Sequence, residues 1–176
     1  GTTVGPFFWL LTFCLIYEAF DPSLLGMHFT STCGRVISDR YGDAFVDDTK
    51  FGVTAIQQCG SHEVTSEAIA DQELQELQDT RALAQQYEKL LTATGGALNL
   101  KKSHWVFLTW RWKHGRAYLA TKSEAPAELQ LTSGLSTMEE EVPRIEPYDS
   151  YRTLGVHIAV NGRMTKTMKL CSYLQL

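Results

Sequence analysis

The chain has 176 residues, of which 44% are apolar, enough for one domain of ordinary size with a hydrophobic core. Its net charge of −4 argues weakly against nucleic acid as a partner, and its four cysteines are widely spread without a C-x-x-C pair. Neither a zinc site nor a disulfide framework is therefore expected, and the cysteines fit a reduced, intracellular protein that is not secreted. Because the sequence begins with glycine inside an apolar run, we interpret it as a piece of a longer protein.

The first predicted element is a buried helix at residues 6–20. Residues 7–17 are apolar with one exception, and Gly5-Pro6 and Glu18 close this run. A membrane span needs roughly 20 such residues, and a signal peptide needs a basic leader, which the sequence lacks. A buried helix with proline near its first turn is therefore favoured, and no membrane partner is expected.

Short strands are predicted next. In residues 27–32 apolar and polar side chains alternate and threonine is present, which is typical of a strand. Residues 33–40 predict a polar loop. Residues 41–54, with the sequence YGDAFVDDTKFGVT, predict two short strands with Asp47-Asp48 at the turn between them.

Residues 66–93 predict the clearest helix, because apolar side chains recur at three-, four- and seven-residue spacing. This face consists of Leu74, Leu77, Ala84, Tyr87 and Leu91. The opposite face is polar, so the helix is expected to cover a core on one side only. Gly95-Gly96 is a strong stop, since glycine accepts the left-handed conformation that ends helices.

A hairpin is predicted from residues 105–112 and 116–120, turning between them. Its tryptophans could stack on nucleic-acid bases, but core packing or cover for the sheet is the favoured interpretation. They are Trp105, Trp110 and Trp112.

Beyond this hairpin, residues 122–148 contain three prolines and predict a mostly irregular connection. One short strand is expected at residues 129–132, and the glutamates at 139–141 are expected in a solvated loop. A strand is predicted at residues 152–160, and residues 166–176 could begin another helix.

Charge is distributed unevenly along the chain. Residues 1–88 carry 4 basic and 13 acidic side chains, whereas residues 89–176 carry 12 basic and 7 acidic ones. From Lys101 to Lys122 there are six basic residues and no acidic one. Such a split suits carboxylates that bind metal ions and cations that contact a nucleic-acid backbone, although chance clustering on a solvated surface explains it equally well.

The dipeptide Asp47-Asp48 carries the chemistry that the sequence suggests. Nucleotidyl transfer uses two magnesium ions, about 4 Å apart, that clamp the attacking and leaving oxygens. Magnesium prefers carboxylate ligands, and a tight turn can hold two of them at the end of a pair of strands. Alone, such a pair is weak support, because most are solvated turns.

The order of the neighbouring motifs strengthens this hypothesis. G-P-x-x-W, F-V-D-D-T, T-G-G-A-L-N-x-x-K and Y-R-T-L-G-V follow one another along about residues 1–165. In these motifs the chain resembles reverse transcriptases of retroelements related to non-LTR retrotransposons and group II introns, most of all those of microalgae and other protists. The palm of these enzymes is described by sequence blocks lettered A to E. The matches to blocks C and D are specific when taken together, and the matches to blocks B and E are weaker.

The resemblance implies an α+β fold, with a partial palm in which helices pack on one face of an antiparallel sheet. Residues 1–121 would form this partial palm, residues 122–148 the irregular connection, and residues 149–176 the primer-grip strand and the start of a thumb. The implied activity is RNA-directed DNA synthesis with two Mg²⁺ ions, or Mn²⁺ in their place. The implied partners are an RNA template, a DNA primer and dNTPs, and a nuclear location is expected if the element is eukaryotic.

Each motif implies a role for its residues. Asp47 and Asp48 match the metal-binding pair of block C. Phe45 matches the aromatic residue of that block, and Val46 the residue that touches the primer end. Lys102 matches the block D lysine, which lies near the triphosphate and can protonate the leaving pyrophosphate.

Further nucleotide and primer contacts follow from the same resemblance. Lys101 competes with its neighbour for the block D role, and Asn99 would shape the turn before it. Leu154 and Gly155 match the block E strand that grips the primer, where glycine allows close approach. Gly5 belongs to the end of block B, under the template and the incoming nucleotide.

Two departures from the family pattern limit what this chain can do. It contains neither the glutamine that opens block B nor block A, whose aspartate completes the metal site, and the fingers are missing as well. The fragment alone is therefore expected to be inactive. The alternatives are a decayed, non-catalytic remnant that binds nucleic acid or serves a structural role, and an unrelated metal-dependent phosphoesterase that uses Asp47-Asp48.

Overall fold

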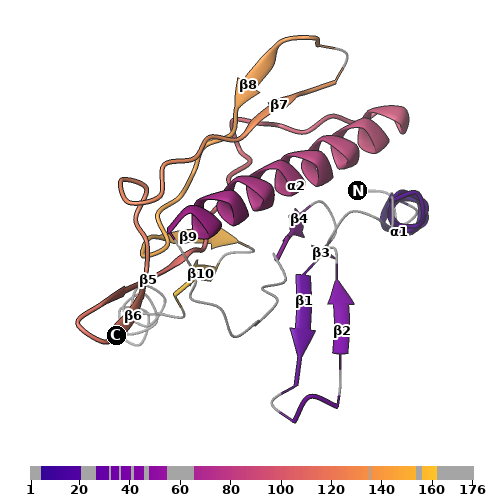
Figure 1. Ribbon diagram of the computed structural model, residues 1–176. Coiled ribbons are helices and arrows are strands. Elements are labelled where there is room, and N and C mark those ends of the chain that lie inside the picture. Colours follow the sequence, from indigo (N-terminus) through magenta and orange to yellow (C-terminus); the bar gives the residue numbers. More distant parts are fainter. Residues whose placement is uncertain are drawn as a thin grey trace, which may run out of the picture. The chain divides into compact units, whose positions relative to one another are not determined.

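The computed structural model of the chain describes residues 5–20, 27–31, 33–35, 37–40, 42–45, 48–54, 66–134, 136–153 and 156–161 (Figure 1). The helices within these ranges are α1 (Gly5–Glu18) and α2 (Ser66–Ala93). The strands are β1 (Met27–Thr30), β2 (Ile37–Arg40), β3 (Gly42–Phe45), β4 (Asp48–Phe51), β5 (Trp110–Lys113), β6 (Arg116–Leu119), β7 (Gln130–Thr132), β8 (Glu139–Glu141), β9 (Ser150–Thr153) and β10 (Val156–Ala159).

The strands combine into short antiparallel hairpins. Each described strand pairs with its neighbour in sequence, giving β1–β2, β3–β4, β5–β6, β7–β8 and β9–β10. Helices and antiparallel strands together make the protein α+β, which confirms the predicted class. Among the described residues the pairing does not extend to one larger sheet.

The chain divides into two compact units. The first comprises residues 1–100 and 130–141, and the second residues 101–129 and 142–176. The segments predicted from the family resemblance, 1–121, 122–148 and 149–176, stay a prediction.

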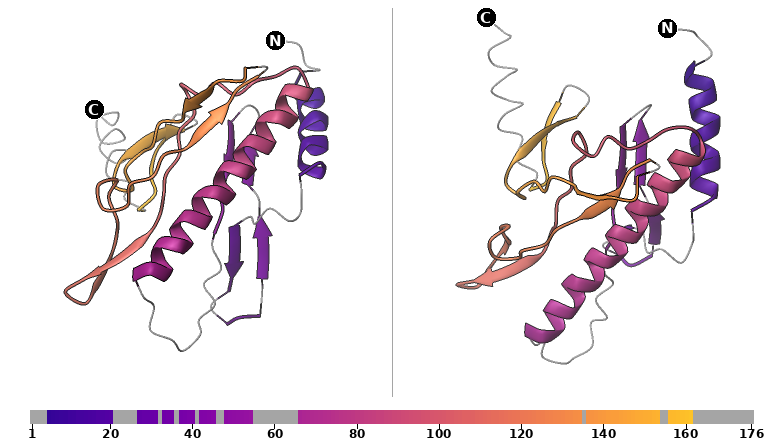
Figure 2. Two further views of the ribbon diagram at one scale, coloured as in Figure 1. Left: turned by 45° about the horizontal axis from the view of Figure 1, so that its top comes forward. Right: turned by 90° about the horizontal axis from the view of Figure 1, so that it is seen from above.

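The core of the first unit lies where α1 meets α2. Phe13, Ile16 and Phe20, from α1 and the residues after it, pack with Leu83, Tyr87 and Leu91 of α2. In both views of Figure 2, α1 lies beside the C-terminal half of α2. Burial of these apolar side chains is the main stabilising term of the unit.

The helix α1 was predicted correctly in position, but its burial was not. Its apolar side chains surround the whole helix, whereas α2 covers only one side of it. The large side chains that stay exposed are Phe7, Phe8, Leu10, Leu11 and Leu15. No helix within the described ranges is long and apolar enough to span a bilayer.

The helix α2 has the predicted bounds, and the glycines after it explain its end. Gly95 adopts a positive φ of 86°, and its amide donates to the carbonyl of Thr92 at 3.0 Å. The Gly96 amide donates to the carbonyl of Leu91 at 3.0 Å, which completes a Schellman motif. A Cβ on Gly96 would meet the Leu91 side chain at 2.9 Å.

The predicted apolar face of α2 is only partly correct. Tyr87 and Leu91 are buried, as expected, but Leu74 is exposed and the core begins at Leu83. The prediction also missed Glu88, which is buried on the same side of the helix. The N-terminal half of α2 therefore contributes little to the described core.

The strands of the first unit extend beyond those predicted. The strand expected at residues 27–32 is confirmed as β1, but half of the polar loop expected at 33–40 is strand β2, which is a correction. Propensity missed β2 because its ISDR sequence carries two charged residues, and pairing with β1 outweighs that preference. A Cβ on Gly52, just after β4, would run into the Met27 side chain at the start of β1.

In the second unit, Trp105 occupies the centre of a small core. Its indole N–H donates to the carbonyl of Val142 at 3.1 Å, and the guanidinium of Arg144 lies 5.4 Å from the ring centroid. The same guanidinium lies 5.5 Å from the Phe107 ring and donates to the carbonyl of Ala125 at 2.6 Å. The prediction that Trp105 belongs to the core is confirmed.

The hairpin predicted after residue 105 is confirmed as β5–β6, with a shorter first strand. Residues 105–109 instead contribute the buried side chains of Trp105, Phe107 and Thr109 to the core of the unit, and Trp105 forms an isolated parallel bridge with Arg144. For the other two tryptophans core packing, one of the two roles expected for them, is wrong. Trp110 is 61% exposed and Trp112 is 74% exposed.

The segment after residue 122 departs from prediction in two places. The short strand expected at 129–132 is confirmed as β7, but residues 139–141, expected in a loop, form its partner β8. They are exposed, as expected. The single strand expected at 152–160 is instead the hairpin β9–β10, in which Thr153 pairs with Val156.

Candidate functional site

The motif F-V-D-D spans the hairpin β3–β4. Phe45 ends β3, Asp48 begins β4, and the two residues are paired. Val46 and Asp47 fall between them and lie outside the described residues. The two strands predicted from the sequence are therefore confirmed, and Asp48 belongs to the second strand.

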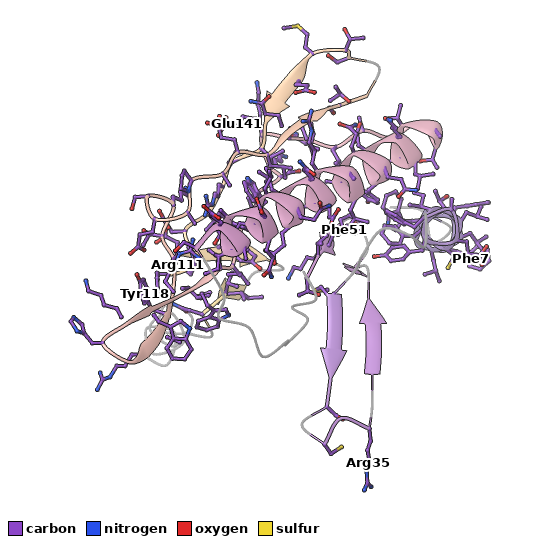
Figure 3. The ribbon with its side chains drawn as sticks, in the orientation of Figure 1. Phe7, Arg35, Phe51, Arg111, Tyr118 and Glu141 are labelled. Atoms are coloured by element: carbon purple, nitrogen blue, oxygen red, sulfur yellow. The ribbon has the colours of Figure 1, made fainter. Side chains whose placement is uncertain are left out.

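Tyr87 of α2 anchors the strand that begins with Asp48. Its hydroxyl lies 3.1 Å from Thr49 Oγ1, and its ring centroid lies 4.5 Å from that of Phe51, the residue labelled in Figure 3. The Phe20 ring is parallel to that of Tyr87, with ring centroids 6.3 Å apart and an interplanar angle of 4°, and its centroid lies 5.7 Å from that of Phe51. Burial raises the pKa of Tyr87, so the phenol is neutral at pH 7 and can share its proton with Thr49.

The next residue of α2, Glu88, holds the loop that follows the helix. Its side chain is 1% exposed, and its carboxylate accepts the amide of Leu98 at 2.8 Å and the amide of Gly134 at 2.5 Å. Thr92 Oγ1 adds a third hydrogen bond at 3.0 Å. Such bonds replace the water that a buried carboxylate loses.

Leu98 is held on both sides of its peptide unit. Its amide is bound by Glu88, and its carbonyl accepts a hydrogen bond from Ser133 Oγ at 2.7 Å. This fixes the middle of T-G-G-A-L-N-x-x-K two residues before Leu100, which is buried. No signal in the sequence points to Glu88 beyond its position beside Tyr87 and three residues before Leu91.

Two further side chains of α2 secure the hairpin β7–β8 that supplies Ser133 and Gly134. Gln85 Oε1 accepts the Thr132 amide at 2.9 Å, and its Nε2 donates to the Thr132 carbonyl at 3.2 Å, as a neighbouring strand would. One turn earlier, Arg81 forms an ion pair with Glu139. The helix thus positions both the loop and the hairpin that supports it.

The remaining predicted site residues are distributed as follows. Asn99, Lys101 and Lys102 are exposed and follow the loop held by Glu88; the two lysines begin the second unit. Gly5 is the first residue of α1. The last two, Leu154 and Gly155, fall between β9 and β10 and lie outside the described residues.

Carboxylates are good ligands for magnesium, and Asp47-Asp48 would supply two of them. Among the described residues, no three histidine, cysteine or acidic side chains gather closely enough to bind a metal ion.

Comparison with models of known families, with curated proteins and with solved structures gives no match.

Proposed function

We propose that the chain is part of the palm and the start of the thumb of a reverse transcriptase, which performs template-directed nucleotidyl transfer. The observation that carries the proposal is the pairing of Phe45 with Asp48, because it leaves only two residues between the strands. Consecutive aspartates at the end of such a hairpin suit two-metal phosphoryl transfer. The order of the four sequence motifs supports the same assignment.

The way α2 holds two of these motifs also supports the proposal. Tyr87 binds Thr49, beside the aspartates, and the adjacent Glu88 binds Leu98, four residues before Lys102. Consecutive residues of one helix thus bind the strand that would carry metal ligands and the loop that precedes Lys101 and Lys102 in the sequence. Catalytic groups need support of this kind, because small displacements of reacting groups cost much of the rate.

In the proposed reaction a primer 3′-hydroxyl attacks the α-phosphate of a dNTP. Asp47, Asp48 and an aspartate from upstream would hold two Mg²⁺ ions, which offset the charge that develops on the phosphate oxygens. Lys102 would donate a proton to the leaving pyrophosphate. Leu154 and Gly155 would contact the primer backbone.

Primer extension on an RNA template tests the catalytic proposal, with a protein that also contains the upstream aspartate. Extension should require Mg²⁺ and should be lost in Asp47→Asn, because a metal ligand is removed. Asp43→Asn, two pairs further from the end of the hairpin, is the matched control and should retain activity. Normal extension by Asp47→Asn would contradict the assignment.

The same experiment separates the alternatives. A folded protein that binds primer and template but never extends the primer indicates a decayed remnant. Phosphate-ester hydrolysis without template or primer indicates the phosphoesterase.

The role of Lys102 has its own test in that assay. Lys102→Ala should slow incorporation more than it weakens dNTP binding, and Lys101→Ala is the matched control. A pure binding defect in Lys102→Ala, or a larger rate defect in Lys101→Ala, would contradict the proposed acid role.

A further inference from the structure

The hairpin β5–β6 is tightly turned at its tip. Lys113 pairs with Arg116, so only His114 and Gly115 connect the strands. Both have a positive φ, 50° and 73°, as in the type I′ turn that matches the twist of a hairpin. The base of the hairpin is fixed as well, because the Tyr148 hydroxyl lies 3.0 Å from both the amide and the carbonyl of Leu119.

One face of this hairpin carries two exposed indoles. Side chains alternate along a strand, so Trp110 and Trp112 lie on the same face, opposite Leu119 and Ala117. Trp110 is 61% exposed and Trp112 is 74% exposed. The two positions are about 7 Å apart along the strand, roughly twice the rise per nucleotide of a stacked strand. An extended single strand can therefore place a base on each indole.

The other face and the tip are cationic. Lys113 and Arg116 are exposed at the tip, and Arg111 lies on the same face, where it donates to Thr109 Oγ1 at 3.0 Å. From Lys101 to Lys122 the sequence has no acidic residue.

One carboxylate does lie near this face, that of Glu124. The Thr121 amide and hydroxyl and the Tyr118 hydroxyl donate to it, each at 2.9–3.0 Å. These hydrogen bonds lower the pKa of Glu124, so it is ionised at pH 7 and offsets part of the positive charge. The cations at the tip still outnumber it.

We propose that the hairpin β5–β6 binds single-stranded nucleic acid, with bases stacked on Trp110 and Trp112 and phosphates beside Lys113 and Arg116. Aromatic rings with flanking cations are the combination that sequence-tolerant single-strand binding uses. Charge complementarity favours this occupant over an apolar protein surface, which would leave the cations at the tip without compensation. The proposal goes beyond nucleotidyl transfer and does not depend on catalysis by the aspartates.

Fluorescence anisotropy with labelled oligo-dT and oligo-U of about 15 nucleotides tests the proposal on the chain itself. EDTA in the buffer excludes any metal-dependent contribution, so failure would leave the polymerase proposal untouched. The chain should bind the single strands more tightly than a duplex of the same length. Trp110→Ala and Trp112→Ala should each weaken binding about tenfold.

Matched variants separate ring stacking from simple apolar contact. Trp110→Phe and Trp112→Phe should each retain most of the affinity, and Trp110→Leu and Trp112→Leu should bind as weakly as the alanine variants, because only an aromatic ring stacks. Met138→Ala removes another exposed apolar side chain, 76% accessible and from a different hairpin, and should bind as the wild type does. Arg116→Gln should reduce the slope of log K against log salt by about 0.7.

Three results would overturn the proposal. The first is unchanged affinity in the double alanine variant, and the second is full rescue of oligonucleotide binding by Trp110→Leu and Trp112→Leu, which indicates apolar contact without base stacking. The third is tryptophan-dependent binding to vesicles of anionic lipid without binding to the oligonucleotides, which indicates a membrane surface.

Discussion

The hairpins β7–β8 and β5–β6 are both short antiparallel pairs, but their surroundings differ. Side chains of α2 hold the first through Arg81, Gln85 and Glu88. The second is held at its base by Tyr148 and along β6 by the bond of Tyr118 with Glu124, and it extends two exposed tryptophans. Isolated two-stranded hairpins are marginally stable, so such attachments decide their role. The first hairpin supports a loop of the candidate site, and the second offers a surface for a partner.

Removal of the Glu88 carboxylate should have the largest effect on stability. Glu88→Ala leaves the amides of Leu98 and Gly134 without their acceptor, which should lower the free energy of unfolding by about 3 kcal/mol. Glu88→Gln keeps the shape and one acceptor oxygen, so about half of that loss is expected. Urea unfolding followed by circular dichroism measures both. A loss below about 0.5 kcal/mol in Glu88→Ala would show that the hairpin is stable without this attachment.

A smaller loss is expected at Gln85, which binds both polar groups of Thr132. Gln85→Ala should cost about 1–2 kcal/mol, because two neutral hydrogen bonds are lost. Gln75, which is exposed on the same helix and donates to Asp79 four residues later, supplies the control. Equal effects of Gln85→Ala and Gln75→Ala in urea unfolding would mean that α2 does not anchor β7–β8.

Tyr87→Phe should cost about 1 kcal/mol, through loss of the hydrogen bond with Thr49. The pKa of Tyr87 is raised in the folded state, so the neutral phenol contributes stability below about pH 10 that is lost as the pH rises through the folded pKa. Wild-type stability should therefore fall more steeply above pH 10 than that of Tyr87→Phe.

Tyr118→Phe is the comparison variant for this pH dependence. A hydrogen bond to Glu124 also raises the pKa of Tyr118, so any alkaline pH dependence that this variant loses comes from the second unit and not from Tyr87. If stability falls equally steeply above pH 10 in wild type and Tyr87→Phe, the claim that the Tyr87 phenol is buried and neutral is contradicted.

The smallest effect on stability is expected at the exposed tryptophans. Trp110→Ala and Trp112→Ala should change the free energy of unfolding by no more than about 0.5 kcal/mol, because both side chains are largely solvated. Thermal unfolding measures this. A loss of about 2 kcal/mol or more would mean that the indoles are part of the fold, and the contrast between the two hairpins would disappear.

Local signals in the sequence predicted the elements that local chemistry determines. The bounds of α2 follow from its apolar period and from Gly95-Gly96, and the hairpin β3–β4 follows from two short arms, each with a phenylalanine, around an aspartate pair. These elements need little information from the rest of the chain.

Tertiary contacts determine what the sequence did not reveal. The strand β8 consists of three glutamates, a poor strand sequence, and forms because β7 pairs with it and Arg81 binds Glu139. Glu88 belongs to the apolar face of α2 by position, yet its partners lie 10 and 46 residues away in the sequence. Likewise, composition cannot distinguish a buried tryptophan such as Trp105 from an exposed one such as Trp112.

Amide hydrogen exchange measured by NMR tests most directly the claim that α2 holds the candidate site. In the wild type, the amides of Leu98 and Gly134 should exchange slowly, because Glu88 accepts both. In Glu88→Gln, which keeps one acceptor oxygen, at least one of the two should exchange at least about tenfold faster while amides in the middle of α2 keep their rates, and Glu67→Gln in the first turn should change neither. Unchanged protection of Leu98 and Gly134 in Glu88→Gln would contradict this claim.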